Sequence, residues 1–217
     1  CRAAKKTTGR KTSHRTQPPP NDEAPMSTTR PIATTRSATG IPTGKLAVWW
    51  VIGSEIVIFG GLLASYIMHR LGHPEWAEYA SHTNAWFGGA NTFVLLTSSL
   101  FAVLAHHAAE HGDGKKAAKW LLGTCAGGLV FLCIKAVEWT GEIQHGYTIT
   151  ANGFWHFYYT AAGLHALHVI AGCIIMLIIA RDAWKGKELQ RVELIGIYWH
   201  FVDIIWIFLF PLLYIAK

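Results

Sequence analysis

Seven ionisable side chains of this 217-residue chain lie inside long apolar stretches, where a charge at the centre of a bilayer costs on the order of 2.5–3.5 kcal/mol. They are Glu55 and three pairs spaced by three residues, which are Lys135/Glu138, His165/His168 and His200/Asp203. Residues three apart share one face of a helix, so the members of each pair can act together. Carboxyl and imidazole groups placed in this way can join helices by hydrogen bonds, carry protons, or ligate a haem or a metal.

The depth of each side chain in a membrane determines which of them can meet. A helix rises about 1.5 Å per residue, which places Glu55 about 13 Å and His168 about 18 Å from the inner face. His200 and Asp203 lie about 6–10 Å from the same face. We therefore predict one polar cluster in the inner half of the bundle, proton-linked or structural, made of Glu55, His165, His168, His200 and Asp203.

Three interpretations of this predicted cluster are open. Interhelical hydrogen bonds alone would contribute about 0.6 kcal/mol per contact. A proton relay would use the Glu55 carboxyl. Haem b would need one axial histidine from each of two facing helices, and His165 or His168 could face His200 or His106 in that way.

Lys135 and Glu138 lie apart from this cluster, close to the outer end of their stretch. We predict an ion pair there, with the Lys135 ammonium extending towards the membrane interface. Aromatic residues near the ends of the stretches predict interface belts; they are Trp49, Trp50, Trp139, Trp155, Tyr158 and Tyr214. The histidines between the first two stretches, His69, His73 and His82, follow no recognised ligand spacing, so we predict no metal site.

The stretches that hold these side chains are long enough to cross a membrane. A hydrocarbon core of about 30 Å needs roughly 20 apolar residues as a helix, and backbone groups in lipid must be paired within the segment. Five stretches qualify: residues 46–68, 85–108, 117–139, 154–180 and 196–216. The chain is 51% hydrophobic and only 15% charged, which argues against a soluble or disordered protein. The fold class is therefore an all-α integral membrane protein with a bundle of five transmembrane helices. Gly123 and Gly127 give the third helix a face of small residues for close packing.

The distribution of lysine and arginine predicts the orientation of the bundle. Sixteen of the 19 cationic residues lie before the first stretch or in the second and fourth connections. The opposite side has Arg70 and Lys217. Because cytoplasmic segments carry the excess of these residues, we expect the N-terminus inside and the C-terminus outside.

Residues 1–45 have a different composition, rich in Thr, Pro, Arg and Lys and without an apolar run. We expect a disordered basic tail, followed by the membrane domain over residues 46–217. Residues 1–25 are interpreted as a product of start-site choice, because Met26 precedes a plausible short tail. A lipidated Cys1 and an organellar transit peptide are the alternatives.

Several segments together resemble subunit III of the haem–copper oxidases. They are Ser54-Glu55 followed by Phe59, His106-His107 with the charged turn from Glu110 to Lys116, Glu138 at the end of its stretch, Gly163-Leu164-His165-Ala166-Leu167-His168-Val169, and Tyr198-Trp199-His200-Phe201-Val202-Asp203-Ile204-Ile205-Trp206. The segments occur in the order of the family, and the resemblance covers about residues 46–217. The last two segments together are the most specific.

The resemblance implies an integral component of cytochrome c or quinol oxidases that binds no redox cofactor itself. Members of the family pack on the catalytic subunit, hold lipid in a cleft between helix groups, and sustain proton uptake. Glu55 matches the family glutamate that reacts with hydrophobic carbodiimides, and His165 and His168 match its histidine pair. Long members have seven spans, whereas this chain resembles the five-span form that is common in bacteria. Lys135 is not expected from the family.

We therefore expect an accessory, non-catalytic subunit III of a proton-pumping terminal oxidase that reduces O₂ to water. Haem and copper are expected in the partner subunits I and II, with membrane lipids as further partners and no nucleic acid. The expected location is the bacterial inner membrane. An accessory subunit of nitric oxide reductase, a b-type cytochrome and a proton-coupled transporter are the alternatives, and the last is disfavoured because no inverted repeat is evident.

Overall fold

The computed structural model describes residues 43–215 and contains five long helices within that range. They are α1 (Thr43–Gly72), α3 (Ala85–Glu110), α4 (Gly114–Gln144), α5 (Gly153–Trp184) and α6 (Gln190–Phe210), and α6 continues into one π-helical turn, η2 (Pro211–Ile215). All five are long and apolar enough to cross a membrane, which confirms the five predicted spans and the all-α class. The first helix begins at Thr43, three residues earlier than predicted. The rest of the predicted tail, and Lys217, lie outside the described residues.

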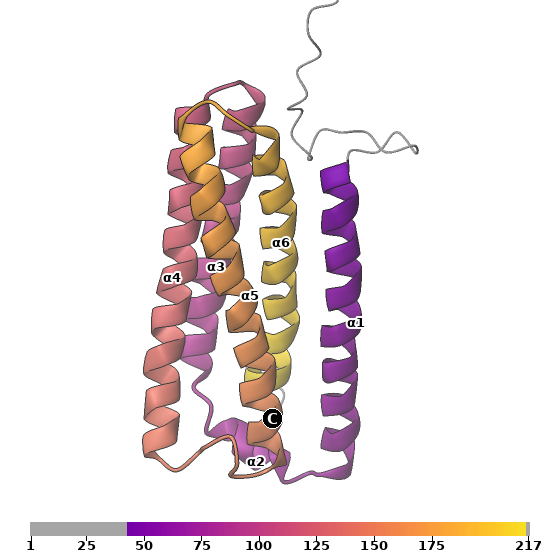
Figure 1. Ribbon diagram of the computed structural model, residues 1–217. Helices are drawn as coiled ribbons and strands as arrows, with labels where there is room; N and C mark the ends of the chain where they lie inside the picture. The colour runs from indigo at the N-terminus through magenta and orange to yellow at the C-terminus, as the bar shows by residue number, and fades with distance from the viewer. Residues whose placement is uncertain (1–42, 216–217) are drawn as a thin grey trace, which may run out of the picture. The chain divides into compact units, whose positions relative to one another are not determined.

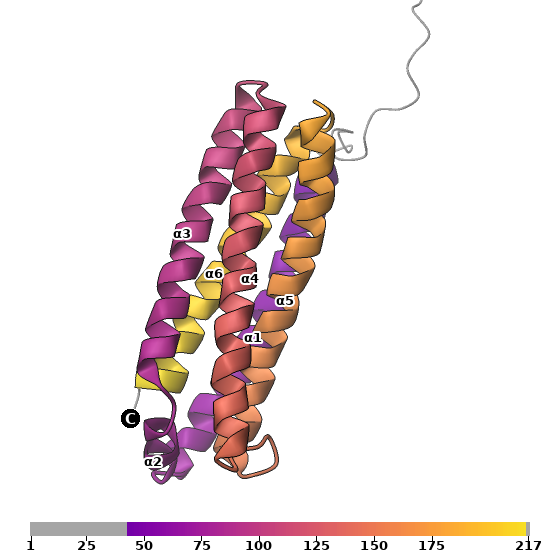
Figure 2. The same ribbon diagram turned by 90° about the vertical axis from the view of Figure 1, so that its left-hand side faces the viewer.

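Helices α3, α4, α5 and α6 pack together into a bundle, and α1 lies along α6 and α5 (Figures 1 and 2). The buried residues of α1 are Ile52, Phe59 and Tyr66, which recur every seven residues and so form one narrow stripe. Other apolar residues of this helix, such as Val57 and Met68, are exposed. An apolar outer surface of this kind suits a helix in contact with lipid.

Three polar contacts, spread along the length of α1, supplement this stripe. Lys45 pairs with Glu193 of α6 at 2.5 Å. Near the middle of α1, Glu55 reaches α5, and at the far end Tyr66 donates a hydrogen bond of 3.0 Å to the carbonyl oxygen of Leu212 in η2. Helix α1 is thus held at three levels although it buries few of its side chains.

A short helix, α2 (Trp76–Ser81), lies in the connection between α1 and α3 and was not predicted. Its Trp76 is buried among aromatic rings of α1 and α5, including Tyr66 and Phe154. We call the end of the bundle at which α2 lies the α2 end (Figure 2). The connection between α4 and α5 lies at the same end.

Small residues let α4 approach α3 closely, as the sequence predicts. A Cβ atom at Gly127 would lie 2.6 Å from the Cβ of Ser98, and one at Gly123 would lie 3.2 Å from the ring of Phe101. Gly128, one position further along, instead faces the side chains of Cys173 and Trp199. Gly123 and Gly127 therefore pack against α3, whereas Gly128 packs against α5 and α6.

Gly127→Ala is expected to destabilise the bundle by about 1–3 kcal/mol relative to Gly141→Ala, because the added methyl group must displace Ser98. Gly141 lies on the same helix and has no atom within 4 Å of an added Cβ, so the matched variant removes the shared gain in helix propensity. Unfolding of both variants in mixed detergent micelles measures the difference. Equal stability would mean that α3 and α4 can separate freely at this level.

The predicted interface belts are wrong for three of the six aromatic residues. Trp155, Tyr158 and Tyr214 are completely buried, whereas Trp49 and Trp50 are exposed. A position near the end of a span fixes the depth of a side chain but not the side of the helix on which it lies. The three buried rings face the interior of the bundle at the α2 end.

Candidate functional site

Glu55 of α1 and His168 of α5 form a polar pair between two otherwise apolar helices. Glu55 Oε2 lies 3.1 Å from His168 Nε2, and both side chains are about one-sixth exposed. The other ring nitrogen, Nδ1, lies 2.8 Å from the carbonyl oxygen of Leu164. A carbonyl oxygen can only accept, so Nδ1 carries a hydrogen.

This tautomer determines how many protons the pair holds. A neutral imidazole protonated at Nδ1 would present a lone pair at Nε2 to the carboxylate oxygen, and two acceptors would then face each other. One further proton, on either Nε2 or the carboxyl, resolves the contact. A hydrogen bond between Glu55 and His168 would require that proton. The ring of Phe59 packs edge-on against the histidine at 5.4 Å.

His200 and Asp203 of α6 lie on the side of the bundle that faces α3. His200 Nδ1 is 2.6 Å from the hydroxyl oxygen of Ser99, and the buried Asp203 carboxyl lies beside the same serine. A cavity of about 190 Å³ adjoins His200 and is also lined by His106 and Glu193. These groups form a second polar site, between α3 and α6.

His165 belongs to neither pair. It is completely buried, with its ring between Phe131 at 5.3 Å and Trp206 at 5.2 Å. Among the described residues, no ion pair or hydrogen bond links the Glu55–His168 pair to His200 and Asp203. The side chains predicted to form one cluster thus occupy three places, because residues of similar depth project towards different neighbouring helices.

Three of the four histidines considered for haem ligation face other polar side chains, whereas the ring nitrogens of His165 have no hydrogen-bond partner among the described residues. His168 faces Glu55, His200 faces Ser99, and His106 Nε2 lies 3.3 Å from Glu110. His165 is packed against aromatic rings. Within residues 43–215 there is also no group of three His, Cys, Asp or Glu side chains that could hold a metal ion.

Lys135 lies inside the bundle at the α2 end and is 1% exposed. Its ammonium lies 3.0 Å from Glu138 Oε2, so the two side chains form an ion pair. The ammonium does not extend to the interface as we expected. It donates instead to the hydroxyl groups of Tyr158, at 3.3 Å, and of Tyr214.

Four aromatic rings surround the same ammonium group. The centroids of Trp139, Tyr158, Trp206 and Tyr214 lie 5.1–5.7 Å from Lys135 Nζ, within the range of cation–π attraction. We call these four rings the aromatic cage. All three ammonium hydrogens have acceptors, so the cage holds a fully hydrogen-bonded cation.

Sequence reasoning missed Glu142, which joins the same group of side chains. Its Oε1 lies 3.1 Å from the Tyr158 hydroxyl, and its Oε2 lies 3.4 Å from the Tyr159 hydroxyl. Glu142 follows Glu138 by four residues, which is the spacing of one helical face. This spacing could have indicated that Glu142 lies beside Glu138. It was not used because the predicted third span ended at residue 139.

The chain is similar to several known proteins. The family model described as cytochrome c oxidase subunit III matches residues 33–217. The chain is 35% identical to cytochrome c oxidase subunit 3 of Thermostichus vulcanus, over 75% of this chain and 82% of the relative. It is 31% identical to the protein of the same name from Corynebacterium diphtheriae, over 76% of this chain and 84% of the relative.

A longer relative combines two subunits in one chain. The heme-copper oxidase subunit I+III of Aeropyrum pernix is 30% identical over 187 residues, which are 79% of this chain and 22% of that protein. The match to the family model and the extent of these similarities show that the chain belongs to the cytochrome c oxidase subunit III family, the accessory membrane subunit of haem–copper oxidases.

Proposed function

We propose that this chain stabilises the catalytic subunit of a proton-pumping terminal oxidase and supports the uptake of protons for O₂ reduction. The observation that supports the proposal is the contact of 3.1 Å between the Glu55 carboxyl of α1 and the His168 imidazole of α5, two groups that can carry a proton. Neither residue binds a cofactor in this proposal. Haem and copper belong to the partner subunits I and II, and electrons come from cytochrome c or a quinol.

The fused relative supports subunit I as the direct partner. In that protein the two subunits are one chain, so their membrane domains are synthesised and retained together. Apolar residues exposed on α1 and α3, such as Val57 and Phe93, provide surface for a membrane partner or for lipid. Contact with subunit I would place an accessory bundle beside the proton-conducting subunit.

We assign the chain to the bacterial inner membrane, with the N-terminus of α1 inside. The relatives named above come from two bacteria and one archaeon, and the cationic residues of the α3–α4 and α5–α6 connections lie at the end where α1 begins (Figure 1). The Glu55–His168 pair lies near the middle of α1 and α5. In this orientation the α2 end faces outward.

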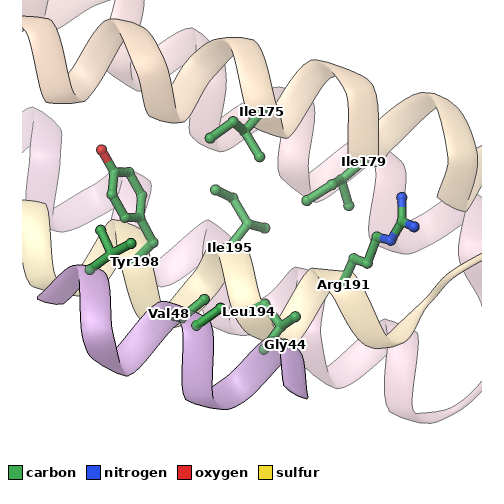
Figure 3. A pocket seen from close by; sticks show the side chains of 10 residues that line it. Gly44, Val48, Ile175, Ile179, Arg191, Leu194, Ile195 and Tyr198 are labelled. Atoms are coloured by element: carbon green, nitrogen blue, oxygen red, sulfur yellow. The ribbon is translucent and has the colours of Figure 1, made fainter. Parts of the chain in front are cut away.

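Lipid is a further proposed partner, supported by a pocket between α1, α5 and α6 (Figure 3). The pocket has a volume of about 410 Å³ and is lined by apolar side chains, among them Val48, Ile175 and Ile195. Arg191 lies at one end of it. An acyl chain would fill the apolar part, whereas the guanidinium of Arg191 is already paired with Asp182 at 3.8 Å and Glu188 at 3.3 Å.

Purification of the tagged chain from native membranes in mild detergent tests the assignment. We expect the catalytic haem–copper subunits to co-purify and to give the optical spectrum of an oxidase. A chain that copurifies with nitric oxide reductase, or that carries haem by itself, would contradict the proposal. Peptide mass spectrometry of the co-purifying subunits identifies which enzyme it is.

Glu55→Gln is expected to abolish labelling of this subunit by a hydrophobic carbodiimide, because the reagent needs a protonated carboxyl within the membrane. Glu138→Gln is the control, since Glu138 lies inside the bundle and is only 4% exposed. Peptide mass spectrometry after labelling identifies the modified residue. Labelling of the Glu55→Gln variant at full strength would show that another carboxyl is the reactive one.

A further inference from the structure

A second group of ionisable side chains lies at the α2 end, and among the described residues no hydrogen bond or ion pair joins it to the Glu55–His168 pair. We define the tyrosine–carboxylate network as Lys135, Glu138, Glu142, Tyr158 and Tyr214, which come from α4, α5 and η2. The network adjoins a cavity of about 510 Å³ that is lined by both glutamates and by residues of the connections at this end. The proposed function uses none of these groups.

The charges in this network do not balance. One ammonium, that of Lys135, faces two carboxyl groups, those of Glu138 and Glu142. The three side chains are 1%, 4% and 8% exposed. A buried carboxylate without a counter-charge is strongly destabilising, so the site requires one more positive charge than its side chains supply.

The hydrogens in this network are also too few for its contacts. The Tyr158 hydroxyl lies 3.1 Å from Glu138 Oε1, 3.1 Å from Glu142 Oε1 and 3.0 Å from the Tyr214 hydroxyl. It has one hydrogen to give. The Tyr214 hydrogen goes to Glu138 Oε1, at 2.7 Å, and the Tyr159 hydrogen has a carbonyl acceptor, Tyr147 O, at 2.8 Å.

One added proton on Glu142 removes the charge imbalance and supplies the hydrogen for the contact between Glu142 and Tyr158, so that only the contact between the Tyr158 and Tyr214 oxygens is left without one. A protonated Glu142 Oε1 donates to the Tyr158 oxygen, whose second lone pair accepts from Lys135. Tyr158 then donates its own hydrogen to Glu138 Oε1. The chain of donors runs without interruption from Glu142 to Glu138, and the charge of the network becomes zero.

We propose that the tyrosine–carboxylate network binds one exchangeable proton at Glu142 and exchanges it with the aqueous phase at the α2 end through the adjoining cavity. The site is separate from the Glu55–His168 pair and does not depend on the proposed function. The ligand of this site is a proton. A metal cation could supply the same missing positive charge, and the experiment below distinguishes the two.

The cavity supplies the route for this exchange. His82, His145 and Tyr147 line it together with Glu138 and Glu142, and the rings of His82 and Tyr147 stack at 5.0 Å. The titratable groups that face Glu142 are thus these three residues, Tyr159 of α5 and the other members of the network. Histidines at the mouth can pass protons between bulk water and the buried carboxyl.

Infrared spectroscopy of the complex that contains this chain tests the proposal. We expect a carbonyl-stretch band from a protonated carboxyl that is lost in Glu142→Gln and retained in Glu78→Gln, the control variant at an exposed position of α2. The band should decrease reversibly as the pH of the medium is raised. The glutamine variant should fold, because its amide can donate the hydrogen that we assign to the carboxyl.

Two results would overturn the proposal. If the spectra of the wild type and of Glu142→Gln were the same, Glu142 would not hold a proton. If the band appeared in the wild type only after treatment with a metal chelator, a metal cation would occupy the site instead.

A second measurement needs no substitution. A water-soluble carbodiimide, added with an amine nucleophile, modifies protonated carboxyl groups, and peptide mass spectrometry locates the product. We expect Glu142 to be modified at a pH at which the exposed carboxyls of Glu75 and Glu78 are not. Modification of Glu142 only at the low pH that these two require would identify it as an ordinary carboxylate and overturn the proposal.

Discussion

Lys135→Met is expected to destabilise the folded bundle by about 3–5 kcal/mol, because it leaves the buried Glu138 carboxylate without its cation. Methionine fills much of the space of the lysine side chain, so the effect comes mainly from the lost charge and hydrogen bonds. The loss should be greater at high pH and smaller at low pH, where protonation of the carboxyls removes the need for a counter-charge. Unfolding in mixed detergent micelles over a pH series measures both effects.

Two variants separate this electrostatic effect from a general effect of substitution. Lys119→Met changes an exposed lysine of the same helix and should leave stability within about 0.5 kcal/mol of the wild type. In the double variant Lys135→Met/Glu138→Gln, the neutral amide replaces the stranded carboxylate, and most of the lost stability should return. A double variant as unstable as Lys135→Met would show that packing, and not charge, determines the effect.

Trp206→Ala is expected to cost about 3–5 kcal/mol, since it removes a completely buried indole from the centre of the bundle. The ring contacts Phe131 at 4.9 Å and His165 at 5.2 Å, and its Nε1 donates to Thr92 at 3.1 Å. It is also one wall of the aromatic cage around Lys135. Thermal unfolding of the detergent-solubilised subunit gives the change.

Trp86 is the matched control for this substitution, because its side chain is 89% exposed at the start of α3. Trp86→Ala should change the stability of the isolated subunit little. Trp206→Phe should recover part of the loss, since phenylalanine restores a ring but cannot donate to Thr92. A Trp206→Ala variant as stable as the wild type would be incompatible with the packing described for the bundle centre.

The number of membrane-spanning helices could be predicted from sequence because it depends on one local quantity, the length of an apolar run. Residues 85–108 illustrate this, since the run contains Asn91 and Thr92 and is still a helix. Asn91 is buried within the bundle, and the Thr92 hydroxyl donates a hydrogen bond to the carbonyl oxygen of Gly88. The short helix α2 was missed because six residues give too little periodicity to distinguish a helix from a loop.

The composition of the sites was less predictable. The depth of a side chain along its helix follows from the local sequence, whereas the neighbouring helix that it faces depends on how the whole bundle packs. Glu55 and His168 have similar depths and meet, but His165, one turn from His168, faces Phe131 and Trp206. The hydrogen-bond partners of Lys135 that are distant in the chain are Tyr158 and Tyr214, 23 and 79 residues away. Only the packed bundle shows that these residues share one site.

The three contacts of α1 also determine when this helix can take its place during synthesis. Lys45, Glu55 and Tyr66 bind Glu193, His168 and Leu212, all of which are translated more than 100 residues later. At roughly 5–20 residues per second, the ribosome needs about 6–20 seconds to proceed from Glu55 to His168. During that interval the inserted α1 exposes its glutamate to lipid or to the insertion machinery. Helix α1 is therefore complete before any of these three partners has been translated, and a nascent chain that stops before His168 leaves it without the three contacts.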